Sequence, residues 1–207
     1  MATMAVKFLF RCGLIAVSLS FPVTGMAQVA AEEKPKVSDK PMTADQLAVY
    51  RVVLSGWMDN GKGKHEVLLS VETTPFALDG MDADCGKDLG LGAGPKGEVH
   101  RFRAEDLPKL AQSKVRLVDP DAQRKEVAEN DPGKKIREGS SIKDAVAHGF
   151  AHGLVTLGEI RFDKDHAYAV VWYGFTCGAL CGNGATVILE KKNGKWGVRD
   201  HCSNWVS

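Results

Sequence analysis

Cysteines and glycine-rich turns crowd the C-terminal end of the chain and constrain its fold more than any other feature. Cys177 and Cys181 enclose a Gly-Ala-Leu turn, a Gly-Asn-Gly run follows, and Cys202 lies close to the end of the 207 residues. This pattern predicts strands joined by tight turns and held by disulfides. It does not match a known catalytic or cofactor motif.

Four segments near the C-terminus have the β-branched and aromatic content of strands. They are residues 157–162, 167–175, 185–191 and 195–199. Asn193-Gly194 is a strong signal for a two-residue hairpin turn. If this turn closes the last hairpin, counting outward from it places Cys202 opposite Ala185, beside the turn that holds Cys177 and Cys181. The expected register therefore brings three cysteines together.

An amphipathic helix is expected to begin after Thr43, where the run Thr43 to Gln46 has capping-box chemistry. Apolar residues then recur at helical spacing, at Leu47, Tyr50, Leu54 and Trp57. The segment 167–175 is apolar on both sides, which is typical of a central strand covered on both faces. The predicted fold is therefore α+β, with the N-terminal helix packed on an antiparallel sheet whose last strands form C-terminal hairpins.

The middle of the chain is less regular. A strand is expected over residues 66–73, a glycine-rich surface loop over 86–97, a short helix over 104–112 and a strand over 114–118. A polar, turn-rich connection is expected over 119–141. Carboxylates at the ends of the later strands, such as Glu159 and Asp163, are expected to be solvated.

The first 27 residues have the features of a secretory signal peptide. Lys7 and Arg11 precede a short apolar stretch, and Gly25-Met26-Ala27 offers a cleavage site. Residues 28–42 are expected to be a disordered tether, and residues 43–207 a single domain. No later stretch is apolar for the roughly 20 residues that a membrane-spanning helix needs. The sequence predicts a periplasmic or secreted protein.

Removal of Lys7 and Arg11 with the signal peptide leaves 25 of the 27 basic residues, against 26 acidic residues. This near-neutral balance argues against a nucleic-acid partner.

Four cysteines remain after cleavage, and in an exported chain they predict two disulfides. They are Cys85, Cys177, Cys181 and Cys202, and their pairing is left open. A zinc site of three of these cysteines with His201 is an alternative, but an oxidising compartment competes for the thiols. A redox role would need a cation or helix N-terminus to lower the thiol pKa, and the turn offers neither.

His148 and His152 would share one face if their segment were helical, as metal ligands at this spacing often do. Gly149 and Gly153 argue against that helix, so the segment is expected to be a turn that enters the next strand. The sequence therefore predicts neither a metal nor another cofactor.

The C-terminal segment resembles a group of exported bacterial proteins of unknown function. The resemblance rests on a Gly-x-Leu-x-Gly-x-Gly turn, a Gly-x-Trp strand and a terminal Trp-Ile/Val-Ser. The corresponding stretches here are 177–184, 194–196 and 205–207. The resemblance implies export and a C-terminal sheet, and it transfers no catalytic residue.

The expected function is therefore that of an exported, disulfide-stabilised soluble domain. It would bind an unknown envelope or extracellular ligand, or support the cell envelope, without catalysing a reaction. The alternative is an envelope hydrolase that works through His148, His152 or His201, with or without a metal.

Overall fold

The computed structural model describes residues 35–59, 66–76, 84–91, 98–110 and 114–207. The residues from Lys34 onward form one compact unit. The signal peptide expected over residues 1–27 lies outside the described residues.

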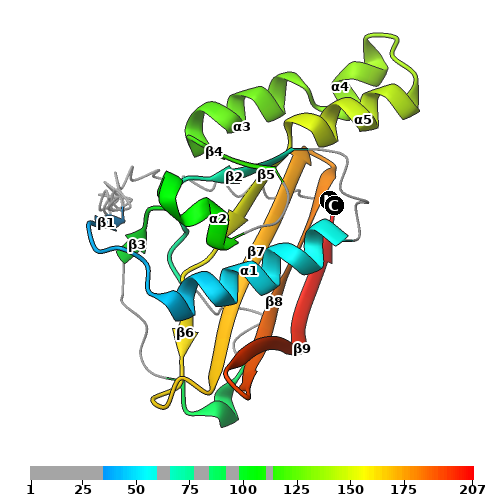
Figure 1. Cartoon of the computed structure of the whole chain (residues 1–207). Helices are drawn as coiled ribbons and strands as arrows, with labels where there is room; N and C mark the ends of the chain where they lie inside the picture. Colours follow the sequence, from blue (N-terminus) through cyan, green and yellow to red (C-terminus); the bar gives the residue numbers. More distant parts are fainter. Residues whose placement is uncertain (1–34, 60–65, 77–83, 92–97, 111–113) are drawn as a thin grey trace, which may run out of the picture. The chain divides into compact units, whose positions relative to one another are not determined.

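A seven-stranded mixed sheet forms the centre of this unit (Figure 1). In spatial order the strands are β4 (Val115–Val118), β2 (Val67–Ser70), β5 (Leu154–Leu157), β7 (Tyr168–Gly178), β8 (Cys181–Lys192) and β9 (Lys195–Val206), and β6 (Arg161–Phe162) pairs with β7. The C-terminal hairpins β7–β8 and β8–β9 are antiparallel, as expected. β2 instead runs parallel to β4 and β5, so the sheet is mixed rather than antiparallel throughout.

The N-terminal helix α1 (Ala44–Asp59) crosses one face of the sheet, which confirms the predicted α+β architecture (Figure 1). Its capping box is present: the Gln46 backbone N–H donates to Thr43 Oγ1 at 3.2 Å, and the Thr43 N–H donates to Gln46 Oε1 at 2.8 Å. Leu47, Tyr50 and Leu54 are buried in the main core. The Trp57 side chain, expected on the same face, lies outside the described residues.

Ordered structure begins before Thr43, which corrects the expected tether for residues 35–42. β1 (Lys36–Ser38) pairs in parallel with β3 (Glu98–His100), and the Met42 side chain is buried. Because the partner strand lies some sixty positions further along the chain, the local composition of residues 35–42 does not reveal it.

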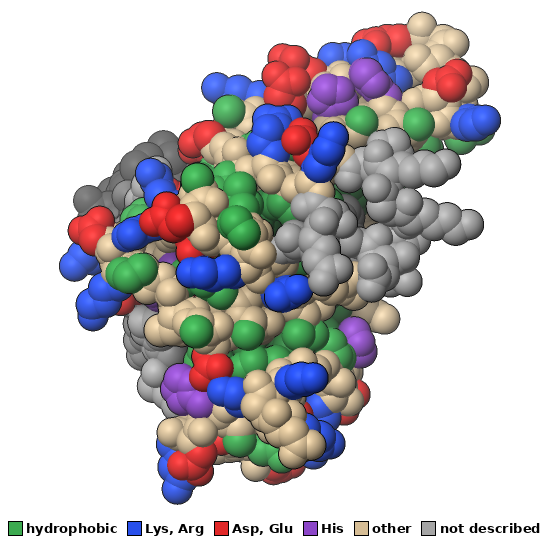
Figure 2. Space-filling model, in the orientation of Figure 1, with side chains coloured by type: hydrophobic (Ala, Val, Ile, Leu, Met, Phe, Trp, Pro, Cys, Tyr) green, Lys and Arg blue, Asp and Glu red, His purple; other side chains and the backbone are tan. Residues whose placement is uncertain are grey.

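Three helices replace the connection expected over 119–141 and the turn expected at 147–153: α3 (Pro120–Glu129), α4 (Pro132–Arg137) and α5 (Ile142–His152). The side chains of Asp119, Asp131 and Ser141 cap them in turn. Proline is well tolerated at the first helical position, where its missing N–H would have no partner anyway. These helices lie at one end of the sheet, and charged side chains of both signs cover them (Figure 2).

Short helices also occupy the middle of the chain. η2 (Lys87–Leu89) lies in the region expected to be a loop, of which residues 92–97 are outside the described part. η3 (Ala104–Asp106) and α2 (Leu107–Leu110) occupy the short helix expected over 104–112.

The register of the last hairpin differs from the expected one because β9 contains two bulges. Lys192 faces Lys195 as predicted, but Ala185 faces Asn204 rather than Cys202. Each bulge adds one residue to β9, and Cys202 lies within one of them, between His201 and Ser203. Bulges of this kind bend an edge strand and discourage pairing with another chain.

Candidate functional site

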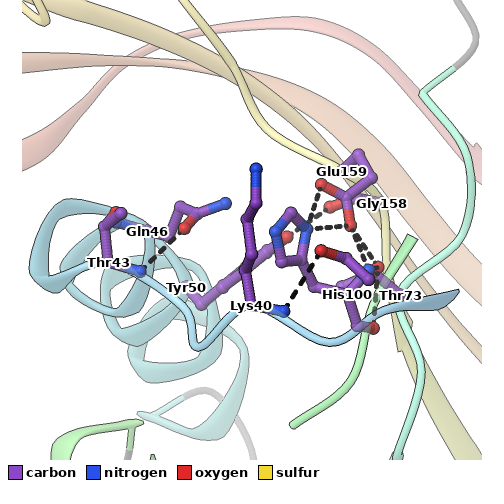
Figure 3. Close-up of polar contacts among 9 residues, drawn as sticks. Lys40, Thr43, Gln46, Tyr50, Thr73, His100, Gly158 and Glu159 are labelled. Carbon is purple, nitrogen blue, oxygen red and sulfur yellow. Dashed lines mark hydrogen bonds and ion pairs between the residues drawn. The ribbon is translucent and has the colours of Figure 1, made fainter. Parts of the chain in front are cut away.

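A buried carboxylate is the centre of a polar cluster that joins several segments of the chain (Figure 3). Glu159, which follows β5, is 1 % exposed. Its carboxylate accepts hydrogen bonds from the His100 backbone N–H at 2.7 Å and from the Thr73 hydroxyl, and both of its oxygens lie 3.0 Å from His100 Nδ1. Glu159 was expected to be solvated, so this is a correction, and Asp163 is buried as well.

Helix α1 also contributes a side chain to the cluster. The Tyr50 hydroxyl donates a 3.0 Å hydrogen bond to the carbonyl oxygen of Gly158, next to Glu159 (Figure 3). Burial raises the pKa of Tyr50 well above its ordinary value, and the nearby charge of Glu159 raises it further. Tyr50 is therefore a protonated donor at any physiological pH.

A carboxylate that holds a histidine Nδ1 is a common arrangement in acid–base enzymes, because it orients the other ring nitrogen toward a substrate. Here the adjacent cavity, of about 270 Å³, is lined by Val37, Ser38, Asp39, Arg101 and Arg103, and neither His100 nor Glu159 contributes to its wall. No hydroxyl or thiol is hydrogen-bonded to the His100 ring among the described contacts. The cluster joins β3, the residue after β5 and the segment after β2.

His100 was not among the candidate residues expected from the sequence. A histidine in a short strand has no local signal, and Glu159 is 59 positions away. A glutamate directly after an apolar strand was the available hint, but sequence alone does not bring the two together.

The four cysteines form two disulfides, Cys85–Cys202 and Cys177–Cys181. Two disulfides were predicted with the pairing open. The expectation that Cys202 lies beside Cys177 and Cys181 is wrong, because the bulges in β9 move Cys202 away from the β7–β8 turn. The pairing leaves none of these thiols for the zinc site considered with His201.

The candidate histidines lie on two separate elements. His148 and His152 are on α5, with their ring centroids 4.9 Å apart, and His201 is exposed on β9. None of the three side chains has a carboxylate partner among the described contacts. Within the described residues, no group of three or more His, Cys, Asp or Glu side chains is placed to hold a metal ion. The described part of the chain also contains no helix long and apolar enough to cross a membrane.

The sheet face opposite α1 carries two half-buried tryptophans above glycines. A Cβ atom at Gly174 would lie 2.9 Å from Cη2 and Cζ2 of Trp172, and one at Gly184 would lie 2.5 Å from Nε1 of Trp205. Because Gly174 and Gly184 are paired across β7 and β8, the two indoles cover neighbouring backbone positions. Trp172 lies in the segment 167–175, which was expected to be covered on both faces, but its side chain is half-buried rather than buried.

No protein-family model, no curated protein and no solved structure matches the chain. The resemblance to exported bacterial proteins therefore stays a prediction.

Proposed function

We propose that the protein is an exported binding module that takes a neutral oligosaccharide on the sheet face of Trp172 and Trp205. The proposal rests on the observation that both indoles lie over glycines on neighbouring strands. We refer to this surface as the tryptophan face.

The indole geometry suits stacking on a flat ligand. A Cβ atom points away from the plane of a sheet, so a ring that occupies its place lies over the backbone. The glycines at 174 and 184 give that space to Trp172 and Trp205. Both indoles are half-buried, so part of each ring is exposed, and tryptophan is a favoured residue at binding surfaces.

Hydroxyl-bearing side chains lie beside the indoles on this face. The register places the following side chains on the same face of the sheet: Thr156, Trp172, Thr176, Thr186, Ser203 and Trp205. Thr176 is exposed, and Thr156 and Ser203 are half-buried. Hydroxyl groups beside aromatic rings match a sugar, which offers C–H groups on one side and hydroxyls at its edges. None of these six side chains is charged, and charged residues begin at the next positions of this face, where Arg161 faces Val170 and Asp200 faces Ile188.

The two disulfides support an oxidising location, as do the features of the predicted signal peptide. Glycans are abundant at cell surfaces, so an exported domain meets this class of ligand.

A glycan array of neutral oligosaccharides tests the proposal on the mature, oxidised protein. The oligosaccharide that the array retains is then titrated by tryptophan fluorescence. We expect Trp205→Ala to weaken binding about 5- to 150-fold, by analogy with nucleic-acid bases stacked on an aromatic side chain, which lose about 1–3 kcal/mol when that side chain is replaced by alanine.

Val206→Ala is the matched control, because Val206 is 85 % exposed and is the next residue on the same edge strand. Its register partner, Asn183, lies on the opposite side of the sheet from Gly184. Equal affinity of the Trp205→Ala and wild-type proteins, or no retained oligosaccharide, would refute the proposal.

A further inference from the structure

His148 and His152 lie one turn apart on the surface of α5. Side chains four positions apart share one face of a helix. The glycines at 149 and 153 were expected to prevent this helix, but α5 runs from Ile142 to His152. Gly149 is required there because a Cβ atom would lie 2.6 Å from Cγ of Pro132, so this glycine reflects close packing rather than a turn.

The separation of the two rings matches that of two imidazoles bound to one metal ion. Bonds of about 2.0–2.1 Å to one nitrogen of each ring, at angles between about 90° and 109°, put the ring centroids roughly 4.5–5.2 Å apart. The observed separation of the His148 and His152 centroids is 4.9 Å. The rings are therefore already close to the spacing that a chelate requires.

The helix that carries the histidines is held at both ends. Ser141 caps its start, where the Asp144 backbone N–H donates to Ser141 Oγ at 3.1 Å. At its end, the Gln123 side chain on α3 donates a 2.6 Å hydrogen bond to the carbonyl oxygen of His152. Ligands fixed on a rigid helix lose little conformational freedom on binding, which favours affinity.

Both rings are accessible. His148 is exposed and His152 is half-exposed, and Figure 2 shows histidine side chains gathered over the helices at this end of the molecule. The described residues offer no cluster of three or more ligand side chains at this place. Water would therefore complete the coordination of a metal ion held here.

We infer that His148 and His152 form a two-imidazole chelate for a divalent transition-metal ion. Imidazole suits copper, nickel and zinc, and affinity rises to Cu²⁺ in the series of divalent metals. The site is independent of the tryptophan face, so either proposal can fail without the other. The four cysteines that are paired in disulfides do not compete for the metal.

Calorimetric titration of the chelator-treated, mature protein with Cu²⁺ tests this inference. We expect one tight site per chain. Loss of either imidazole through His148→Ala or His152→Ala should weaken it at least about tenfold, since even residues that only support a metal ligand cost about 10–100-fold when lost. Electron paramagnetic resonance of the Cu²⁺ complex should show two coordinated nitrogens from the protein in the wild type and one in each variant.

A variant that keeps the number of histidines but breaks their spacing is the matched control. Ala147→His combined with His148→Ala puts the two imidazoles five positions apart, on different sides of the helix. Ala147 is exposed, so this variant should fold as the wild type does. The control should bind Cu²⁺ no better than His148→Ala. Wild-type affinity in the control, or in both single variants, would overturn the inference.

Discussion

The carboxylate of Asp131 accepts a hydrogen bond from the backbone N–H of Ala179 at a distance of 2.6 Å. Asp131 also caps α4 by accepting from the Lys134 N–H at 2.8 Å. Ala179 lies in the turn that the Cys177–Cys181 disulfide encloses. One side chain therefore joins the helical end of the molecule to the tip of the β7–β8 hairpin.

Replacement of this side chain by Asp131→Ala should lower the free energy of unfolding by about 1–2 kcal/mol at neutral pH, because loss of a helix N-cap costs about that much. Urea unfolding measures the change. Glu129→Ala is the control: Glu129 is exposed near the end of α3 and should change stability by no more than about 0.5 kcal/mol.

The contribution of Asp131 to the free energy of unfolding should depend on pH. The hydrogen bond from Ala179 lowers its pKa in the folded state, and the bond from Lys134 adds to this. A carboxylate whose folded-state pKa is lowered stabilises the fold above its unfolded-state pKa, about 3.9, and loses this contribution as the pH falls through the folded-state value. The difference in unfolding free energy between wild type and Asp131→Ala should therefore become smaller below about pH 4. A gap that is constant from pH 7 to pH 2.5 would contradict the assigned role of the charge.

The two disulfides should differ in their contribution to stability. Cys85–Cys202 closes a loop with a sequence separation of 117, and Cys177–Cys181 one of 4. In the chain-entropy description these loops stabilise by about 5 and about 2 kcal/mol. Cys85→Ser with Cys202→Ser should therefore lower the unfolding free energy more than Cys177→Ser with Cys181→Ser. Peptide mapping without reduction checks the pairing, and any cross-link between Cys202 and the β7–β8 turn would contradict it.

The glycines beneath the indoles give a further prediction. Gly174→Ala should push the Trp172 ring from its seat, at a cost of about 1–3 kcal/mol for overpacking, and shift the tryptophan emission. Gly197→Ala is the control on the same sheet, because a Cβ atom there would meet nothing within 4 Å. An unchanged emission spectrum in Gly174→Ala would show that the ring does not depend on this glycine.

Loss of one partner from the Glu159 cluster should lower stability as strongly as breaking a buried ion pair does. His100→Ala removes the ring and leaves the carboxylate of Glu159 short of a partner, which should cost about 3–5 kcal/mol. Glu72→Ala is the comparison, because Glu72 pairs with the exposed Arg101 and a surface pair contributes about 0–1 kcal/mol. Chemical denaturation of both variants distinguishes the two cases, and a His100→Ala protein as stable as Glu72→Ala would contradict a stabilising role of the Glu159 cluster.

The sequence predicts those elements whose signals are local. The capping box at Thr43 and the Asn193-Gly194 turn each act within a few residues, and both are present. The helices α3 and α4 also have a local signal that was misread, because Asp119-Pro120 and Asp131-Pro132 are caps followed by proline at the first helical position. These pairs resemble turns until the helical residues after them are considered.

The features that sequence did not reveal depend on distant contacts. A bulge shifts the register without altering the alternation that identifies a strand, so the place of Cys202 could not be counted from the turn. Gly149 looks like a helix breaker until the position of Pro132 is known. The pairing of His100 with Glu159 likewise depends on how β3 lies against the end of β5.

The contacts of Asp45 connect the two ends of the described chain. Its carboxylate accepts hydrogen bonds from Lys191 Nζ at 2.7 Å and from Trp196 Nε1 at 3.1 Å. A ribosome makes residue 45 long before residue 196, so the first helix has no sheet to close against during most of synthesis. The contact with Trp196 therefore forms only after the last hairpin has been made. A chain that ends before β9 leaves the start of α1 without this partner and without the part of its apolar cover that Trp196 supplies.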